Sequence, residues 1–186
     1  MKNYYYFVAT LPWISYGDPP PVGSREFRDQ CRGLIEPRDA ALTEYCRYDP
    51  PVILAAVRPT GSAFIDLLMA RERALLLNLA YLRALRLKRP SPGEPPHDVP
   101  QAEAAAKAAF EMEDPLQAEL YLDRSRWDAL DAMVGVDYFG VNNIFAYLMK
   151  LQLLERRQLF DAERGLAGYT KLYDAIVNEY NPIPKT

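Results

Sequence analysis

Hydrophobic side chains recur along much of the chain at spacings of three and four residues, which is the period of an amphipathic α-helix. The clearest example begins at Val141. Its apolar positions continue as Ile144, Phe145, Leu148 and Leu151. This pattern predicts a helix from Val141 to about Phe160 with one buried face.

Prolines separate this helix from others, because proline lacks the backbone N–H and pushes the preceding residue out of the helical region. The predicted helices cover 24–35, a short stretch from Pro37, 62–89, 101–112, 114–124, 125–134 and 166–180. A separate helix is expected at Ser125, because Ser125-Arg126-Trp127-Asp128 has the form of a capping box. Residues 4–11 are too few for their period to distinguish a helix from a strand, and we favour a helix.

Capping residues stand at several of these boundaries. Ser62 and Asp114 are placed as N-caps, Pro37 as a first helical residue and Gly135 as a helix end. The short helix from Pro37 is expected to turn inward with Ala41, Leu42, Tyr45 and Cys46. In 62–89, seven of the eight residues from Leu75 to Leu82 are apolar, which is typical of a helix surrounded by other helices.

The pattern as a whole predicts a single all-α domain over 1–186. The proline-rich segment 90–100 is the best linker candidate, and it separates possible helical modules at 1–89 and 101–186. The sequence Ala-Tyr-Leu-x-x-Leu occurs at 80–85 and again at 146–151. A duplicated helical module explains this echo, and so does the chance similarity of two amphipathic helices; both explanations stay open.

Composition removes several classes of function. The 186 residues include 22 Lys+Arg and 25 Asp+Glu, a formal net charge of -3, with two cysteines and one histidine. This set cannot form a four-cysteine or a two-cysteine, two-histidine zinc site, and the slightly acidic balance argues against nucleic-acid binding. Neither a signal peptide nor a membrane span is indicated. We therefore expect a cytoplasmic protein in which Cys31 and Cys46 are buried thiols.

No known catalytic motif occurs in the sequence. It contains no phosphate-binding loop, no Gly-x-Gly-x-x-Gly turn, no Gly-x-Ser-x-Gly elbow and no His-Glu-x-x-His pair. The single imidazole, His97, lies among prolines, where nothing is expected to hold a catalytic tautomer. We predict no enzymatic activity, no cofactor and no metal, with an unrecognised enzyme as the alternative.

Charge is distributed unevenly. Residues 71–89 hold six basic residues and one acid, whereas residues 103–137 hold nine acids and three bases. We expect these segments to lie against each other and partly neutralise. The alternative is that the basic end faces an acidic protein partner, where charge steers docking.

Two stretches carry a resemblance to a known family. They are Asn3-Tyr4-Tyr5-Tyr6-Phe7-Val8-Ala9-Thr10-Leu11-Pro12 and the run from Asp137 through Asn143 to Leu148, continued by Leu151-Gln152-Leu153-Leu154-Glu155-Arg156. They resemble a bacterial family of unknown function encoded among V-type ATP synthase genes. The stretch from Asn78 to Arg89-Pro90 is also similar to the asparagine-leucine helices of the all-helical, funnel-like protein that seats the central stalk of a V-type ATPase on its membrane rotor ring. This chain is about half as long as that funnel-like protein.

The resemblance implies a shortened form of the funnel-like protein, built of two packed helical modules. Such a chain is a non-catalytic spacer or socket between the central stalk and the membrane rotor ring, which are the implied partners, and it lies in the cytoplasm or peripherally at the inner membrane. The expected partner-interface residues are Arg83, Arg86, Lys88 and Arg89, with Asp137 and Asn143 as weaker candidates. A free-standing adaptor or assembly factor for the same complex is the alternative.

Overall fold

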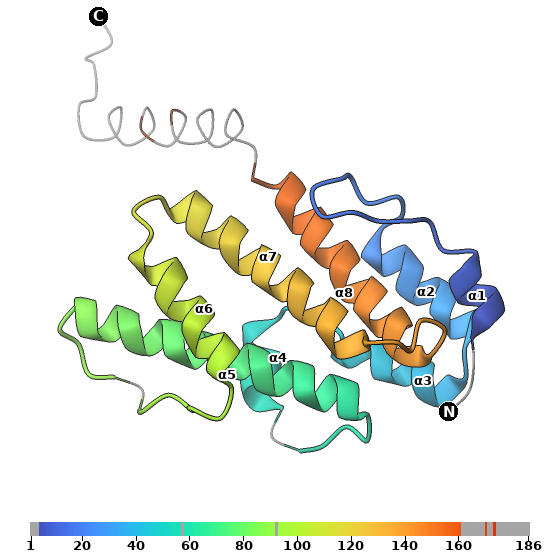
Figure 1. The fold of residues 1–186 in the computed structure, drawn as a ribbon, viewed down its shortest axis with the longest axis horizontal. Helices are drawn as coiled ribbons and strands as arrows, with labels where there is room; N and C mark the ends of the chain where they lie inside the picture. Colours follow the sequence, from blue (N-terminus) through green and yellow to red (C-terminus); the bar gives the residue numbers. More distant parts are fainter. Residues whose placement is uncertain (1–3, 57, 92, 161–169, 171–172, 174–186) are drawn as a thin grey trace, which may run out of the picture.

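The computed structural model describes residues 4–56, 58–91, 93–160, 170 and 173. These residues form an all-helical body without β-strands (Figure 1). The α-helices are α1 (Tyr5–Ala9), α2 (Ser24–Leu34), α3 (Pro37–Leu42), α4 (Pro50–Ala55), α5 (Ala63–Arg86), α6 (Pro100–Glu111), α7 (Pro115–Val134) and α8 (Val141–Gln158). A 3₁₀ helix, Thr43–Tyr45, follows α3. The predicted all-α class is therefore confirmed, whereas the helix predicted at 166–180 lies outside the described residues, apart from residues 170 and 173.

Most helix boundaries follow the predicted caps. The Ser62 hydroxyl accepts a hydrogen bond from the Ile65 amide, and the Asp114 carboxylate accepts one from the Leu116 amide at 2.9 Å. Gly135 ends α7 with a φ of 60°, a left-handed conformation that glycine adopts without strain. The sequence signals for helix ends were thus sufficient at these positions.

The helix start predicted at Ser125 is wrong, because α7 continues through it. The Ser125 hydroxyl and carbonyl oxygens accept hydrogen bonds from Arg71 Nη2 at 2.8 and 3.0 Å. The side chain therefore serves a tertiary contact and does not cap a helix. One buried face, with Leu122, Arg126 and Leu130, runs without interruption past this residue.

The inward face predicted after Pro37 is only partly right. Cys46 is buried and Leu42 is half-buried, but Ala41 is exposed and Tyr45 is 42% exposed. The reason is that α3 ends at Leu42 and the 3₁₀ helix turns by a different angle per residue, so that Thr43 is buried in place of Tyr45.

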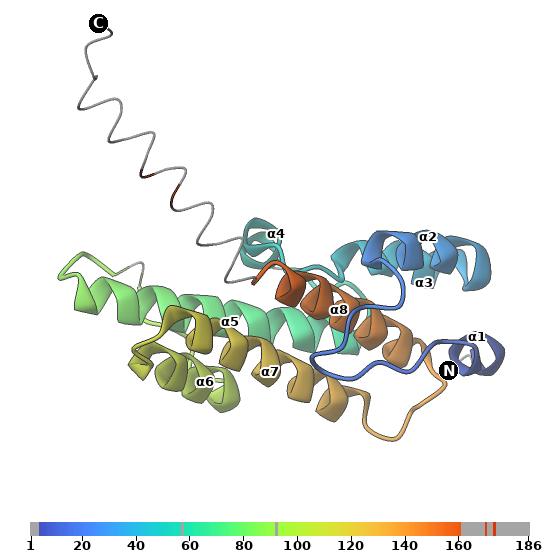
Figure 2. The ribbon, with the colours of Figure 1, turned by 90° about the horizontal axis from the view of Figure 1, so that it is seen from above.

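The longer helices are arranged around two antiparallel neighbours, α7 and α8. In both ribbon views α2 lies on the outer side of α8, and α6 lies beside α7 and α5 (Figures 1 and 2). The loop that joins α7 to α8 lies at the same end of the molecule as α1, whereas the C-terminal end of α5 lies at the opposite end. The body therefore has two distinct ends.

Two hydrophobic clusters fill this body. The first, the large core, is made of bulky side chains from α2, α8, the beginning of α5 and the end of α7, among them Phe27, Ile65, Trp127, Phe145 and Leu148. The second, the alanine core, joins the later part of α5 to α6 and the beginning of α7; it consists of Ala74, Leu75, Leu79, Ala102, Ala105, Ala106, Ala109 and Leu122. Each cluster draws residues from both sides of 90–100, so this segment connects helices that share their cores.

Four charged side chains are buried where the two cores meet, and they form the buried ion network: Arg71, Glu72, Asp123 and Arg126. Arg126 contacts Glu72 at 2.9 Å and Asp123 at 2.8 Å, while Arg71 contacts Glu72 at 2.7 Å. Burial lowers the pKa of Arg126, but the charge of Glu72 outweighs burial and the pKa is raised. Burial raises the pKa of Asp123, against the opposing effect of Arg156. The network ties the middle of α5 to the middle of α7.

Candidate functional site

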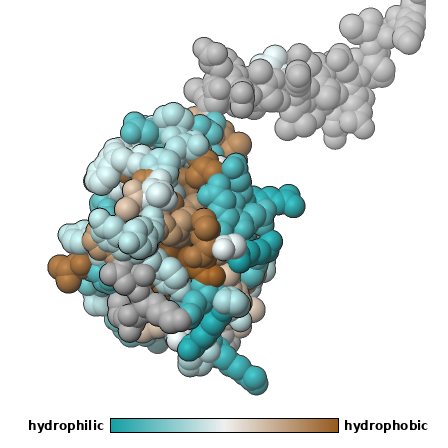
Figure 3. All heavy atoms as spheres, turned by 90° about the vertical axis from the view of Figure 1, so that its right-hand side faces the viewer, coloured by the Kyte–Doolittle hydropathy of each residue, from teal (hydrophilic) through white to brown (hydrophobic). Residues whose placement is uncertain are grey.

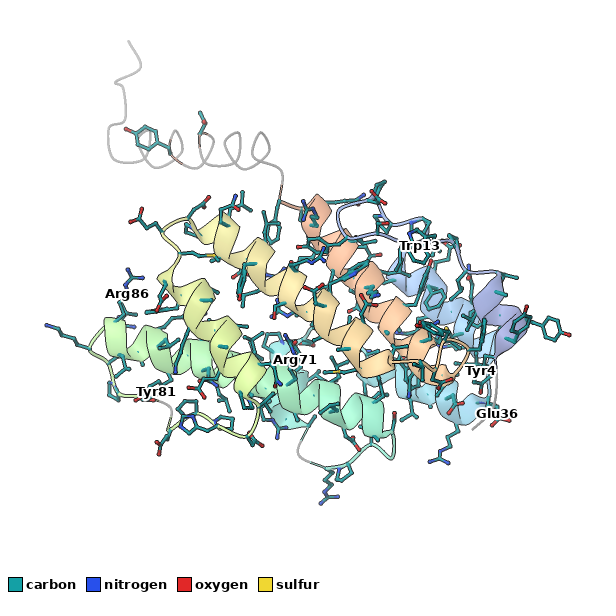
Figure 4. All side chains as sticks on the ribbon, in the orientation of Figure 1. Tyr4, Trp13, Glu36, Arg71, Tyr81 and Arg86 are labelled. Carbon is teal, nitrogen blue, oxygen red and sulfur yellow. The ribbon has the colours of Figure 1, made fainter. Side chains whose placement is uncertain are left out.

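The basic residues predicted as a partner interface lie together at one end of the molecule. Arg83 and Arg86 are exposed on the last turns of α5, and Lys88 and Arg89 follow the helix end. Figure 4 shows Arg86 at the end farthest from Tyr4. None of the four forms an ion pair with a carboxylate of the residues that the structure describes. We call this group the basic end.

The expected neutralisation between segments 71–89 and 103–137 does not occur in the described part of the chain. The acids of the second segment pair with nearer cations: Glu103 with Lys107, Glu119 with Arg156, Asp128 with Arg124 and Asp131 with Lys150. The ion pair that does cross joins Glu72 to Arg126, an acid of the basic segment to a base of the acidic one. The antiparallel packing of the helices sets these distances, and net charge per segment does not reveal it.

A cleft of about 320 Å³ lies beside the basic end. Arg83 and Arg86 line it from α5, and Glu113 lines it from the turn between α6 and α7. The apolar side chains that line it are Leu79, Leu87, Phe110, Met112 and Leu122, with Ala109, Pro115 and Ala118. The Arg86 guanidinium lies 5.1 Å from the centre of the Phe110 ring, a cation–π geometry that holds it at the rim. This is the basic cleft.

Asp137 and Asn143, the two weaker interface candidates, do not join the basic end. They lie in and after the loop between α7 and α8, at the other end of the body. Asn143 donates a hydrogen bond to the Tyr138 carbonyl at 2.6 Å. A Cβ atom on Gly140 would come within 1.9 Å of the Asp137 carboxylate, so only glycine fits between this side chain and the start of α8. Both residues therefore shape the loop.

The same end carries a groove that sequence reasoning did not predict. It has a volume of about 450 Å³ and is lined by the segment after α1, by the α7–α8 loop and by α8; its lining includes Leu11, Trp13, Ile14, Tyr138, Phe139 and Tyr147. Trp13 is 90% exposed, and Val136 of the α7–α8 loop is almost as exposed. Figure 3 shows this end with a band of apolar residues between polar ones. We call it the aromatic groove.

Hydrogen bonds fix the walls of the aromatic groove to its floor. The Tyr147 hydroxyl on α8 donates to the Pro12 carbonyl at 3.0 Å, and burial raises the pKa of Tyr147. The Tyr4 amide donates to the Phe139 carbonyl at 2.8 Å, and the Tyr5 and Phe139 rings lie 4.8 Å apart. The two stretches that carry the family resemblance thus meet at this groove. Their shared richness in aromatic residues was the sequence signal that could have linked them.

Polar chemistry in the aromatic groove is limited to a few groups. Lys150 pairs with Asp131, and the Lys150 ammonium lies 4.6 Å from the centre of the Trp127 ring. Asn143 is committed to the loop. The floor thus presents one ion pair and a hydroxyl that is already bonded.

The described residues contain no group of three or more His, Cys, Asp or Glu side chains placed to hold a metal ion. His97 instead faces Glu103, with Nδ1 at 3.0 Å from the carboxylate. Within the same residues no helix combines the length and the apolar character that a bilayer crossing requires.

Comparison with known proteins identifies one family model. Residues 105–180 match a family described as Protein of unknown function (DUF2764), and this match covers less than half of the chain. No curated protein and no solved structure matches the chain. The described part of the matched region includes α7, α8 and most of α6, and so contains the floor of the aromatic groove and one side of the basic cleft. The family description assigns no activity to either.

Proposed function

We propose that the chain is a non-catalytic structural subunit of a V-type ATPase or ATP synthase, a spacer or socket between the central stalk and the membrane rotor ring. A spacer needs contact surfaces at opposite ends of a stiff body. The observation that carries the proposal is that the basic end and the aromatic groove occupy opposite ends of one helical body. The sequence resemblance supplies the identity of the complex.

The buried ion network supports the mechanical part of this proposal. A force applied between the two ends passes through α5 and α7, and these helices are joined at their middles by Glu72 and Arg126. Arg156 of α8 extends the network, because it pairs with Glu119 and contacts Asp123 at 3.5 Å. Three helices are therefore braced by charge-assisted contacts, which are short and directional.

Affinity purification of the full chain from native membranes tests the proposal. We expect the ATPase subunits to co-purify with the chain at a fixed whole-number ratio. Charge reversal at Arg83, Arg86, Lys88 and Arg89 should abolish this co-purification, while the same change at the exposed arginines Arg25 and Arg58 should not. Absence of ATPase subunits from the purified material would contradict the proposal.

The stoichiometry of the purified complex separates the two structural roles. A rotor part is present in every complex, whereas an assembly factor or free-standing adaptor binds a minority of complexes and is missing from the mature ones. Quantitative mass spectrometry of the purified complex measures this ratio. A ratio well below one chain per complex would replace the spacer with the adaptor.

A further inference from the structure

The basic cleft combines an apolar floor with positive charge that is not neutralised. Leu79, Phe110 and Met112 line the cleft, and Arg83 and Arg86 stand at its α5 side. Leu87 lines the cleft while remaining 61% exposed, and Leu85 beside it is 56% exposed. An apolar surface of this kind, rimmed by charged residues, is typical of a protein contact site.

The helix dipole does not account for all of this charge. Cations near the C-terminus of a helix are favourable, but the effect falls off within the last turn. Four cations stand at or beyond this end: Arg83, Arg86, Lys88 and Arg89. Their lack of ion pairs with carboxylates among the described residues leaves them available to a partner that supplies carboxylates.

The opposite side of the cleft restricts the class of partner. Glu111 and Glu113 are exposed near the turn between α6 and α7, and Glu113 lines the cleft across from the arginines. A nucleic-acid backbone or an anionic membrane presents negative charge in every direction, so it would meet these two carboxylates as well. A helix, in contrast, can carry acids along one side and none along the other.

We propose that the basic cleft docks an amphipathic helix of a partner protein, with its aliphatic side chains entering between Leu87 and Met112 and its Asp or Glu side chains pairing with Arg83 and Arg86. This inference names the partner chemistry of the basic end, and it takes its biological setting from the proposed function. The recognition follows the mode in which an amphipathic helix lays its apolar face in a groove. Charge pairing adds orientation and a faster encounter.

Photo-crosslinking tests this inference with the full chain in cells that carry the V-type ATPase genes. Leu87 is replaced by the photoreactive residue p-benzoylphenylalanine, the cells are irradiated, and the crosslinked segment is identified by mass spectrometry. We expect a segment with apolar residues at helical spacing and an excess of Asp and Glu on one flank. Leu67, on the same helix and 52% exposed, is the matched position and should give no such product.

Charge reversal sharpens the result. In the Leu87 probe background, Arg83→Glu with Arg86→Glu should lower the crosslink yield about tenfold or more, because like charges then face each other. Arg25→Glu with Arg58→Glu makes the same change in net charge away from the cleft and should leave the yield within about twofold. These side chains are exposed, and an unchanged thermal unfolding curve checks that each variant is folded.

The outcomes distinguish this inference from the proposed function. A crosslink to lipid, to nucleic acid, to a second copy of this chain, or to a protein segment without the acidic amphipathic pattern would overturn the inference. So would the absence of a crosslink from Leu87 when ATPase subunits co-purify, and in that case the proposed function would stand. A crosslink to an acidic amphipathic helix of a protein outside the ATPase would support the inference and contradict the proposed function.

Discussion

The two ends of the molecule are packed in different ways. Around α8 the large core brings aromatic and branched side chains from distant parts of the sequence into one cluster. Around α6 the alanine core contributes short side chains, so backbones must approach closely and little volume is buried per residue. The large core holds the walls of the aromatic groove, whereas the alanine core holds the basic cleft. The basic end therefore depends more on its connection to the rest of the body than the groove does.

The largest expected effect comes from breaking that connection at the buried ion network. Glu72→Ala leaves Arg71 and Arg126 without their shared carboxylate and should lower the free energy of unfolding by about 3 to 5 kcal/mol. Urea denaturation measures the change. Glu44→Ala is the control, because Glu44 pairs with Arg32 and Arg47 at the surface, where such a pair contributes about 1 kcal/mol or less. Equal effects of the two variants would show that the network does not join the two regions.

A cavity in the large core should have the next largest effect. Leu148 is fully buried on α8, and Leu148→Ala should lower the free energy of unfolding by about 2 to 5 kcal/mol, through lost burial and the cavity that remains. The same denaturation experiment measures it. The exposed Leu159 provides the matched leucine, since it is 75% exposed and its replacement by alanine should be nearly neutral. A nearly neutral result at Leu148 would mean that this core is loosely packed.

The alanine core should respond to the opposite change. Ala106 is fully buried on α6, and Ala106→Leu inserts volume where close packing leaves no room, which should cost about 1 to 3 kcal/mol. Ala104 lies on the exposed face of the same helix, and Ala104→Leu should change stability by about 0.5 kcal/mol or less. Thermal unfolding of the pair gives the difference. Stabilisation by Ala106→Leu would show that α6 is not tightly packed.

The helices were predictable because their signals are local. Apolar spacing, prolines and caps such as Asp114 depend on a few neighbouring residues, and the structure uses them in the same way. Ser125 shows the limit of this reasoning: its sequence pattern is that of a cap, but Arg71, 54 positions away, decides its role. Alanine-rich 101–112 was interpreted from helix propensity alone, which does not reveal that its alanines form a core.

The candidate site was predicted only in part, for the same physical reason. The basic end is a local cluster and was visible as charge in the sequence. The aromatic groove joins the segment after α1 to a loop far along the chain, and Tyr147 meets Pro12 across 135 positions of sequence. The buried ion network was invisible because Glu72 and Arg126 look like residues of a solvated helix face. Contacts of this kind require the packing of whole helices.

The two cysteines report on the large-core end alone. Burial raises the pKa of Cys31 and of Cys46 from 9.0 to about 12, so the reactive thiolate is about a thousandfold rarer at neutral pH than in the unfolded chain. Ellman's reagent at about pH 8 should react slowly with the native protein and at once in about 6 M guanidinium, where the chain is unfolded. Because the folded pKa is the higher one, this contribution to stability is present below pH 9.0 and is lost as the pH rises towards 12. Fast labelling of the native protein would show that the large core opens readily.

The single imidazole reports on the other region, and its effect is the smallest. The hydrogen bond to Glu103, in the first turn of α6, raises the pKa of His97 above 6.5, with Glu94 adding to the effect of that carboxylate. His97 also holds the pKa of Glu103 at about 2, together with Lys107. The one imidazole resonance in an NMR titration should therefore give a pKa above 6.5, and Glu103→Gln should bring it back towards that value.

This contact also has a pH window. Because the folded pKa of His97 is the higher one, the stabilisation is present in full below pH 6.5 and disappears as the pH rises through the folded value. The raised pKa requires that segment 90–100 stays against α6, so adding urea at constant pH tests the comparison between the two ends directly. If the alanine-core end depends on the ion network for its stability, Glu72→Ala should return the His97 pKa to its ordinary value at lower urea than it exposes Cys31 and Cys46. Simultaneous loss of both signals in that variant would mean that the molecule unfolds as one unit and that the two ends, although packed differently, are equally stable.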